Sequence, residues 1–234
     1  MDKNKVFKLM SSFESYSRLQ IEQVNGGWYD NNKDIRWFSN CVGDFDDDII
    51  TEFYLNDHYA RETRWNLWNY TLGLFKKHKI KSNLDVGCAN NHFSFLCNKK
   101  DIFSVGFDPR EDCVYPSESV FRKTFGSNQY GYVGNIKTFI DFFKERDEVL
   151  FDCISILNFL HGNGHIPQEI YELFLLLPKI TKYVMISEPQ WDQLRLPKFT
   201  DNYELLETIK CQVTTGSHMS VSYTHLTLPT IYSV

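Results

Sequence analysis

The stretch "LDVGCANNHFSFL", from Leu84 to Leu96, decides how the whole chain is interpreted. Its first residues form the short apolar run of a buried strand, and its last residues are rich in aromatics and typical of a helix. Between them lies a polar bend whose one glycine is Gly87. The bend is either a nucleotide-binding turn that has lost glycines or a plain connection between a strand and a helix.

Strand and helix patterns alternate from residue 83 onward. Repeated strand–helix–strand units connect by right-handed crossovers and build a mainly parallel sheet with helices on both faces. We therefore expect residues 81–219 to form a Rossmann-like, doubly wound α/β domain. The further strand patterns occupy residues 103–108, 130–135, 151–160 and 182–189, a sixth strand begins within 211–215, and helical patterns occupy residues 136–148, 167–180 and 201–210.

Residues 1–80 differ in composition from the rest of the chain. Four of the five tryptophans lie there, at positions 28, 37, 65 and 68. Residues 57–78 place several aromatic side chains on one side of a helix. We expect an aromatic-rich helical extension, which is either an extra packing layer or a lid over a pocket. Packing is favoured because aromatic side chains dominate protein cores.

The last segment, residues 220–234, resembles translated adapter sequence that is read through at the end of a sequenced fragment. Segments of such origin do not belong in an argument about the fold. We therefore predict that residues 220–234 are a non-native tail, and we leave them out of the expected sheet.

Composition and charge narrow the classes of function. The formal net charge is −5 and the sequence pI is about 5.8, which argues against broad nucleic-acid binding through many phosphate contacts. The six cysteines form no C-x-x-C pair, as expected of free thiols in a reducing compartment. No apolar segment approaches the roughly 18 residues of a membrane span, and the start of the chain lacks the apolar core of a signal peptide. We expect a cytoplasmic protein without a metal site.

Polar residues follow the expected strands at the edge where a parallel sheet binds ligands. Asp108 ends the second strand roughly 20 residues after the turn glycine, where an acid accepts hydrogen bonds from ribose hydroxyls. Asn135 follows the third strand, and its amide suits an adenine edge. A dinucleotide fingerprint would need glycines at positions 87, 89 and 92. Positions 89 and 92 are alanine and histidine, so the pattern disfavours NAD.

Residues 82–190 resemble the class I S-adenosylmethionine-dependent methyltransferases. The family's turn reads E/D-x-G-x-G-x-G, and here it reads D-V-G-C-A-N-N, with Ala89 and Asn91 in place of the later glycines. The segments "VGFDPRE", "GNI", "FDCISILNFLHG" and "YVMISEP" follow in the family's order. The resemblance implies an enzyme that transfers a methyl group from S-adenosyl-L-methionine.

The resemblance also assigns residues to the cofactor. Asp85 and Gly87 lie at its methionine portion, Asp108 holds its ribose, and residues 158–161 face the methyl group and the acceptor. The full set of implied cofactor-binding residues is Asp85, Gly87, Cys88, Ala89, Asp108, Asn135, Ile136 and Asn158.

His161 is the candidate general base, with His165 behind it. A base is needed only if the acceptor loses a proton during transfer, and a loop histidine without a catalytic role fits the sequence equally well. Glu188, after the fifth strand, is either an acceptor contact or a cap.

The acceptor is not fixed by any motif. The acidic net charge favours a small molecule, while an RNA acceptor, as in tRNA-modifying enzymes, is an alternative. A Rossmann-like partner subunit without catalysis is a third. Ala89 is the residue that bears most directly on whether the turn binds a cofactor, and so on the partner-subunit alternative. Its methyl group is compatible with cofactor binding if its φ is negative. Asn91 tolerates left-handed torsions.

Overall fold

A computed structural model of the chain describes residues 2–23, 61–157, 167–188, 204–212 and 220–227. Its helices are α1 (Lys3–Gln23), α3 (Arg61–Lys77), α4 (His92–Lys99), α5 (Glu111–Phe125), α6 (Ile136–Phe143) and α7 (Pro167–Ile180). Its strands are β1 (Ser82–Val86), β2 (Phe103–Asp108), β3 (Gly131–Val133), β4 (Phe151–Leu157), β5 (Thr181–Glu188), β6 (Glu204–Gln212) and β7 (Ser220–Thr227).

The strands form one sheet in the order β3-β2-β1-β4-β5-β7-β6. Strands β1 to β5 are parallel, and β7 is antiparallel to both β5 and β6. Strand β1 lies between β2 and β4, so the connections after β1 and after β3 leave in opposite directions along the sheet. This arrangement confirms the doubly wound, mainly parallel sheet, and it makes the carboxyl end of β1 the switch point where such sheets bind ligands.

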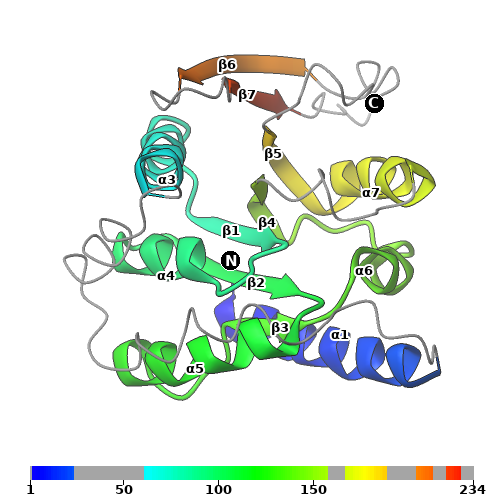
Figure 1. Cartoon of the computed structure of the whole chain (residues 1–234). Helices are drawn as coiled ribbons and strands as arrows, with labels where there is room; N and C mark the ends of the chain where they lie inside the picture. The colour runs from blue at the N-terminus through cyan, green and yellow to red at the C-terminus, as the bar shows by residue number, and fades with distance from the viewer. Residues whose placement is uncertain (1, 24–60, 158–166, 189–203, 213–219, 228–234) are drawn as a thin grey trace.

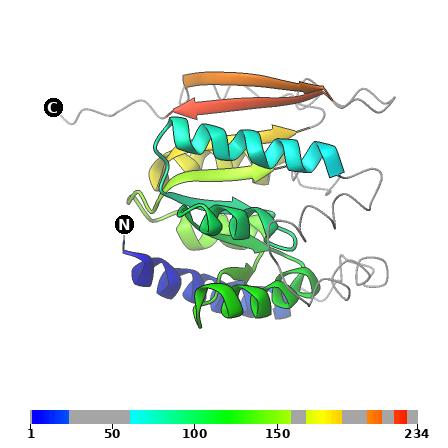
Figure 2. The ribbon, with the colours of Figure 1, turned by 90° about the vertical axis from the view of Figure 1, so that its left-hand side faces the viewer.

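Helices cover both faces of the sheet, as Figures 1 and 2 show. Helices α3, α4 and α5 lie on one side, and α1, α6 and α7 lie on the other (Figure 1). The parallel strands β1 and β2 are buried at every position, as expected when helices shield both faces. A single large core cluster joins side chains from both helical layers and from the strands.

The described helices of the N-terminal extension belong to this core. Phe13 of α1 is fully buried and packs edge-on against Phe107 and Phe139, at centroid distances of 5.3 and 5.7 Å. Phe75 of α3 is also fully buried and contacts Phe93 of α4 at 5.8 Å. In the described part of the extension, each of the two helices therefore packs against the core, on its own side of the sheet. Residues 24–60 lie outside the description.

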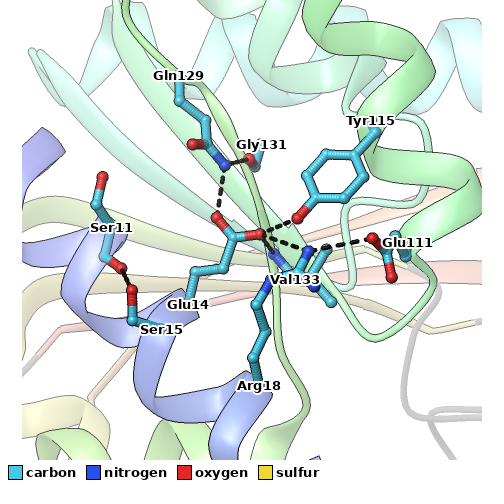
Figure 3. A network of polar contacts seen from close by, with 9 residues as sticks. All are labelled: Ser11, Glu14, Ser15, Arg18, Glu111, Tyr115, Gln129, Gly131 and Val133. Atoms are coloured by element: carbon cyan, nitrogen blue, oxygen red, sulfur yellow. Dashed lines mark hydrogen bonds and ion pairs between the residues drawn. The ribbon is translucent and has the colours of Figure 1, made fainter.

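Helix α1 also covers the free edge of β3 (Figure 3). The Glu14 carboxylate accepts a hydrogen bond from the Val133 backbone N–H at 3.3 Å, and Gln129 Nε2 donates to Glu14 Oε2 and to the Gly131 carbonyl oxygen, each at 2.7 Å. Glu118 of α5 accepts from the Gly131 N–H. Unpaired backbone groups on an edge strand invite pairing with other chains, so these side chains close the edge of the sheet.

The structure corrects one expected element. Residues 201–210 were expected to be helical, but residues 204–212 form strand β6, paired antiparallel with β7. The leucines and glutamates of this segment favour a helix by intrinsic propensity. Pairing with a neighbouring strand overrides that preference, since strand formation depends strongly on context.

The segment left out of the expected fold contributes a strand. Residues 220–227 form β7, which lies between β5 and β6 and aligns Ile186 with Thr224. The structure thus includes part of the predicted non-native tail in the sheet. The origin of that tail stays a prediction.

None of the helices in the described ranges is long and apolar enough to span a membrane.

Candidate cofactor site

The bend after β1 has three left-handed residues. Gly87, Ala89 and Asn91 have φ values of 74°, 48° and 59°. These are the three positions that the resemblance aligns with the family's glycines. The backbone of the turn therefore takes a form that favours glycine at all three positions, even though the chain has glycine at only one of them.

Backbone hydrogen bonds fix this turn to β2. The N–H groups of Gly87 and Cys88 both donate to the carbonyl oxygen of Phe107, at 2.9 and 3.0 Å. The Asn91 N–H donates to the Cys88 carbonyl oxygen at 2.8 Å, and Asn91 then begins α4 as its N-cap residue. The turn is thus a closed unit that ends a strand and starts a helix within five residues, 87–91.

Asn91 is accommodated by glycines in the neighbouring strands. Its side chain is fully buried, and Nδ2 donates to the Tyr130 carbonyl oxygen at 3.1 Å. A Cβ placed on Gly106 of β2 would overlap Asn91 Oδ1 and would lie 2.5 Å from Cys88 Cβ. A Cβ on Gly131 of β3 would lie 3.3 Å from Asn91 Nδ2. The space that a turn glycine leaves empty in the family's pattern is here filled by Asn91, and glycines beneath it provide the room.

Ala89 does not have the negative φ that we expected of a cofactor-binding turn. A negative φ would have made its methyl group harmless, but its φ is 48°. A left-handed torsion costs a residue with a Cβ roughly 1–2 kcal/mol. Its N–H donates to Asp108 Oδ2 at 2.9 Å, and this bond holds the strained residue against the end of β2. The structure therefore places strain at the candidate site, where it is often found.

Asp108 lies where a ribose-binding acid was predicted, but it is already engaged by the protein. Its Oδ1 accepts hydrogen bonds from the backbone N–H and from Nε of Arg110, both at 3.0 Å, and its Oδ2 accepts from Ala89. An ionised carboxylate accepts about four hydrogen bonds, so the three bonds that Asp108 accepts within the described part of the chain leave capacity for a ribose hydroxyl. The Arg110 guanidinium keeps a cation beside this buried acid.

Asp85 is a buried acid at the end of β1. Its exposed fraction is 4%, and the Ser155 hydroxyl donates to its Oδ1 at 2.9 Å. Burial raises the pKa of Asp85 to about 7, the Ser155 hydrogen bond lowers it, and the charge of Asp108 raises it. A carboxyl group with this pKa changes its charge near neutral pH, and a cationic ligand would favour its ionised form.

Asn135 and Ile136 have structural roles at the end of β3. Asn135 is the N-cap of α6: its Oδ1 accepts from the Thr138 N–H at 2.8 Å, and Thr138 Oγ1 accepts from the Asn135 N–H at 3.1 Å. Ile136 is 1% exposed and belongs to the core. The contact of Asn135 with adenine and that of Ile136 with the cofactor stay predictions.

The expected acceptor side of the site lies mostly outside the described residues. Asn158, His161 and His165 all fall within residues 158–166. Glu188 is the last residue of β5, where the description covers the backbone alone. Among the residues that the structure does describe, no group of His, Cys, Asp and Glu is arranged to hold a metal ion.

The structure thus brings together Asp85, residues 87–91 and Asp108 at the carboxyl ends of β1 and β2. This arrangement offers two carboxylates and a left-handed backbone turn to a ligand with hydroxyl and cationic groups. The residue types fit the parts of S-adenosylmethionine, with Asp108 suited to the ribose and Asp85 suited to its positive charges. Sequence reasoning missed the partners of these acids, Ser155 and Arg110. The feature of the sequence that could have indicated Ser155 is a serine within an otherwise apolar strand pattern.

Comparisons with known proteins bear on the fold. No protein-family model matches the sequence, and no curated protein sequence matches it. Among solved structures, the chain is similar to the N-methyltransferase NodS from Bradyrhizobium japonicum WM9 in complex with S-adenosyl-L-homocysteine, with a TM-score of 0.59 and 12% identity over 83% of this chain and 98% of that one.

Two further structures are similar. The putative RNA methyltransferase PH1948 from Pyrococcus horikoshii has a TM-score of 0.57 and 11% identity over 94% of this chain and 98% of its own. The methyltransferase domain of bacterial CtHen1 has a TM-score of 0.51 and 11% identity over 69% of this chain and 97% of its own. Together with the sheet order and the turn after β1, these similarities show that the chain has the fold of the class I S-adenosylmethionine-dependent methyltransferases.

Proposed function

We propose that the protein transfers a methyl group from S-adenosyl-L-methionine to a small-molecule acceptor. The observation that carries the proposal is the turn at residues 87–91. Its three left-handed positions, together with the hydrogen bond between the Ala89 N–H and Asp108, build a backbone cradle beside a carboxylate. A plain connection between a strand and a helix needs neither the torsions nor the acid.

Binding and orientation are the main tasks of the protein in this proposal. S-adenosylmethionine supplies a methyl group already activated by the sulfonium. Asp108 orients the ribose, Asp85 offers a negative charge to the methionine portion, and the turn at Gly87 fixes the distance between them. Holding reactants in line lowers the barrier without a proton transfer. A general base, for which His161 is the candidate, acts only if the acceptor must lose a proton.

The preference for a small molecule rests on charge. The chain has a net charge of −5, and an acidic protein repels the phosphates of RNA over much of its surface. The non-catalytic alternative has one observation in its favour, the strained torsion of Ala89.

Transfer of a labelled methyl group distinguishes the small-molecule, RNA and non-catalytic functions. The protein is incubated with methyl-labelled S-adenosylmethionine and a cell extract divided into RNA and small molecules.

Label in the small-molecule fraction is the expected result, and label in RNA would replace the proposed acceptor class.

The variant Asp108→Ala removes the carboxylate proposed to bind the ribose and should lower affinity for S-adenosylmethionine by about tenfold or more, because hydrogen bonds to a charged group contribute about 1.5–3 kcal/mol. Asp141→Ala, at a half-buried acid on α6, is the matched control and should bind as the wild type does. Equal affinity of all three proteins would refute the role of Asp108.

A further inference from the structure

Three neighbouring strands place a polar side chain inside the sheet. Asn83 of β1, Ser104 of β2 and Ser155 of β4 are all fully buried. Asn83 is aligned with Ser104 of the neighbouring strand, and Ser155 is aligned with Asp85, two residues along β1 from Asn83. Central parallel strands are usually apolar throughout, and a buried polar group destabilises the fold unless it is hydrogen-bonded. Three such groups in adjacent strands therefore call for a functional explanation.

The hydrogen bonds between these residues have a direction. Asn83 Nδ2 donates to Ser155 Oγ at 3.0 Å. Because that oxygen accepts from an amide, the Ser155 hydroxyl hydrogen is available for another acceptor, and Asp85 Oδ1 lies 2.9 Å away. The alternative acceptor, the Leu84 carbonyl oxygen, is more distant at 3.5 Å. The chain of donors thus runs from Asn83 through Ser155 to Asp85.

A second arm anchors the amide of Asn83. Its Nδ2 also donates to Ser104 Oγ at 3.2 Å, and that hydroxyl donates to Ser94 Oγ of α4 at 3.1 Å. Asn98 of α4 donates to the carbonyl oxygens of Ser94 and Ser104, each at 2.7 Å. The amide is therefore held between a helix and the sheet, and this arm does not lead to Asp85.

Several ionisable groups face Asp85 from the surrounding elements. They are Asp108 at the end of β2, Cys88 in the turn, Cys97 of α4 and Cys153 of β4. Burial raises the pKa of each of these thiols, which favours their neutral form. Asp108 has a cationic partner in Arg110. Burial and the charge of Asp108 raise the pKa of Asp85, whereas the Ser155 hydrogen bond lowers it and so favours the ionised form.

We propose that Ser155, oriented by Asn83, is a positioning residue that keeps Asp85 an ionised acceptor for the cationic methionine end of the cofactor. The inference rests on the proposed function and adds to it a role for two strand residues that do not border the turn. It explains why a connected chain of polar side chains lies in the centre of the sheet. It also predicts that the affinity for the cofactor depends on pH through Asp85 and that Ser155 sets the midpoint of that dependence.

The test compares two ligands over a range of pH values. Isothermal calorimetry measures the binding of S-adenosylmethionine and of 5′-methylthioadenosine, which lacks the amino-acid portion, to the wild type and to Ser155→Ala. Loss of one hydrogen bond to a charged group should weaken S-adenosylmethionine about tenfold at neutral pH and move the midpoint upward by about one pH unit. Affinity for 5′-methylthioadenosine should stay unchanged. The amine of the ligand titrates equally in every protein, so the difference between variants reports on the protein.

The matched control is Ser104→Ala, which removes a hydrogen bond of the same Asn83 amide on the arm that leads away from Asp85. It should keep the wild-type midpoint. In an Asp85→Asn background, Ser155→Ala should have no further effect on the binding of S-adenosylmethionine, because a residue that acts through Asp85 loses its effect with that carboxylate. If Ser155→Ala does not fold, Ser155→Cys, with a weaker donor of similar size, should move the midpoint in the same direction by a smaller amount.

A wild-type midpoint in Ser155→Ala, or equal weakening of both ligands, would show a merely structural role and overturn the inference. A wild-type midpoint in the folded Ser155→Cys protein would do the same where the alanine variant cannot be used. These results leave the proposed function standing, because the wild type still binds S-adenosylmethionine. A folded wild type that binds neither ligand would instead refute both the proposed function and the inference.

Discussion

Ala89 has a strained backbone conformation in the turn after β1. It has a left-handed φ of 48°, at a position where the related pattern has glycine. Replacement by glycine removes a torsional cost of about 1–2 kcal/mol but increases the entropy of the unfolded chain by about 0.5–1 kcal/mol. The variant Ala89→Gly should therefore raise the free energy of unfolding by up to about 1 kcal/mol, measured by urea denaturation.

Lys79→Gly is the control for this prediction. Lys79 has a φ of 55° and lies at the opposite end of β1 from the turn. It should gain similar stability and leave ligand binding unchanged. A loss of stability in Ala89→Gly, with a gain in Lys79→Gly, would mean that the methyl group of Ala89 contributes more through packing than it costs in torsional strain.

Asp85 should make the stability depend on pH. Burial raises its pKa from 3.8 to about 7, so the folded state holds a proton more tightly than the unfolded state. Its contribution to stability is fully present below the unfolded pKa and is lost as the pH rises through the folded pKa. Glu118, whose pKa burial raises to about 7, acts in the same direction. The free energy of unfolding should fall by roughly 4–6 kcal/mol between pH 4 and pH 7.

Denaturation at pH 4 and at pH 7 checks this dependence. Asp85→Asn should make it shallower and leave the part that Glu118 contributes, because the amide does not titrate, and should be more stable than the wild type at pH 7. A slope as steep as that of the wild type would assign the dependence to other groups. An acid that destabilises the fold at neutral pH is consistent with a residue kept for binding.

At the scale of residues, position after a strand predicted Gly87 and Asp108 as site residues, and the resemblance added Asp85. Their roles stay a prediction. The sequence did not identify Ser155 or Arg110. Their hydrogen bonds to the two acids depend on which strands are neighbours and on the direction of a side chain, and a local sequence pattern predicts neither. The left-handed torsion of Ala89 was equally unpredictable from the sequence, since alanine rarely adopts such a conformation.

At the scale of elements, Glu14 joins α1 to the edge of β3. Its carboxylate accepts from Gln129, from the Val133 N–H and from the Tyr115 hydroxyl, as Figure 3 shows. Glu14→Ala leaves these donors without that acceptor and should cost about 1–3 kcal/mol. The melting temperature measures the loss.

Ser15→Ala, on the same helix, is the matched control for Glu14. The Ser15 hydroxyl is exposed and bonds the Ser11 carbonyl oxygen of its own helix. The melting temperature of this variant should stay close to that of the wild type. Equal effects of the two substitutions would show that the Glu14 network does not hold α1 in place.

The same scale shows where sequence patterns succeed and fail. Strands β1, β2, β4 and β5 were predicted correctly, because buried parallel strands are short continuous apolar runs. Strand β6 was predicted as a helix, because its alternation of polar and apolar residues is weak and its pairing partner had been set aside.

At the scale of the whole molecule, β7 comes from the predicted non-native tail and joins β6 to the parallel strands of the sheet. Removal of residues 220–234 would take away β7, the strand paired with β5. We expect the shortened protein to melt at a lower temperature and to self-associate, because an uncovered strand edge pairs with other chains. Size-exclusion chromatography and thermal unfolding provide the measurement. A monomer with an unchanged melting temperature would show that five parallel strands with their helices suffice.

The overall topology was predictable from the alternation of strands and helices, since chain-connection rules leave few arrangements of such units. The position of α1 against β3 was not, because no periodicity states which edge of a sheet a helix covers. The acceptor side of the site depends on residues 158–166 and stays a prediction.

The measurement that tests the central claim most directly is a calorimetric titration of the folded wild-type protein with S-adenosylmethionine. We predict saturable binding at one site per chain with a Kd below the millimolar range, and weaker binding by Asp108→Ala. Absence of binding at millimolar S-adenosylmethionine, in a protein whose circular dichroism and melting transition show that it is folded, would contradict the claim.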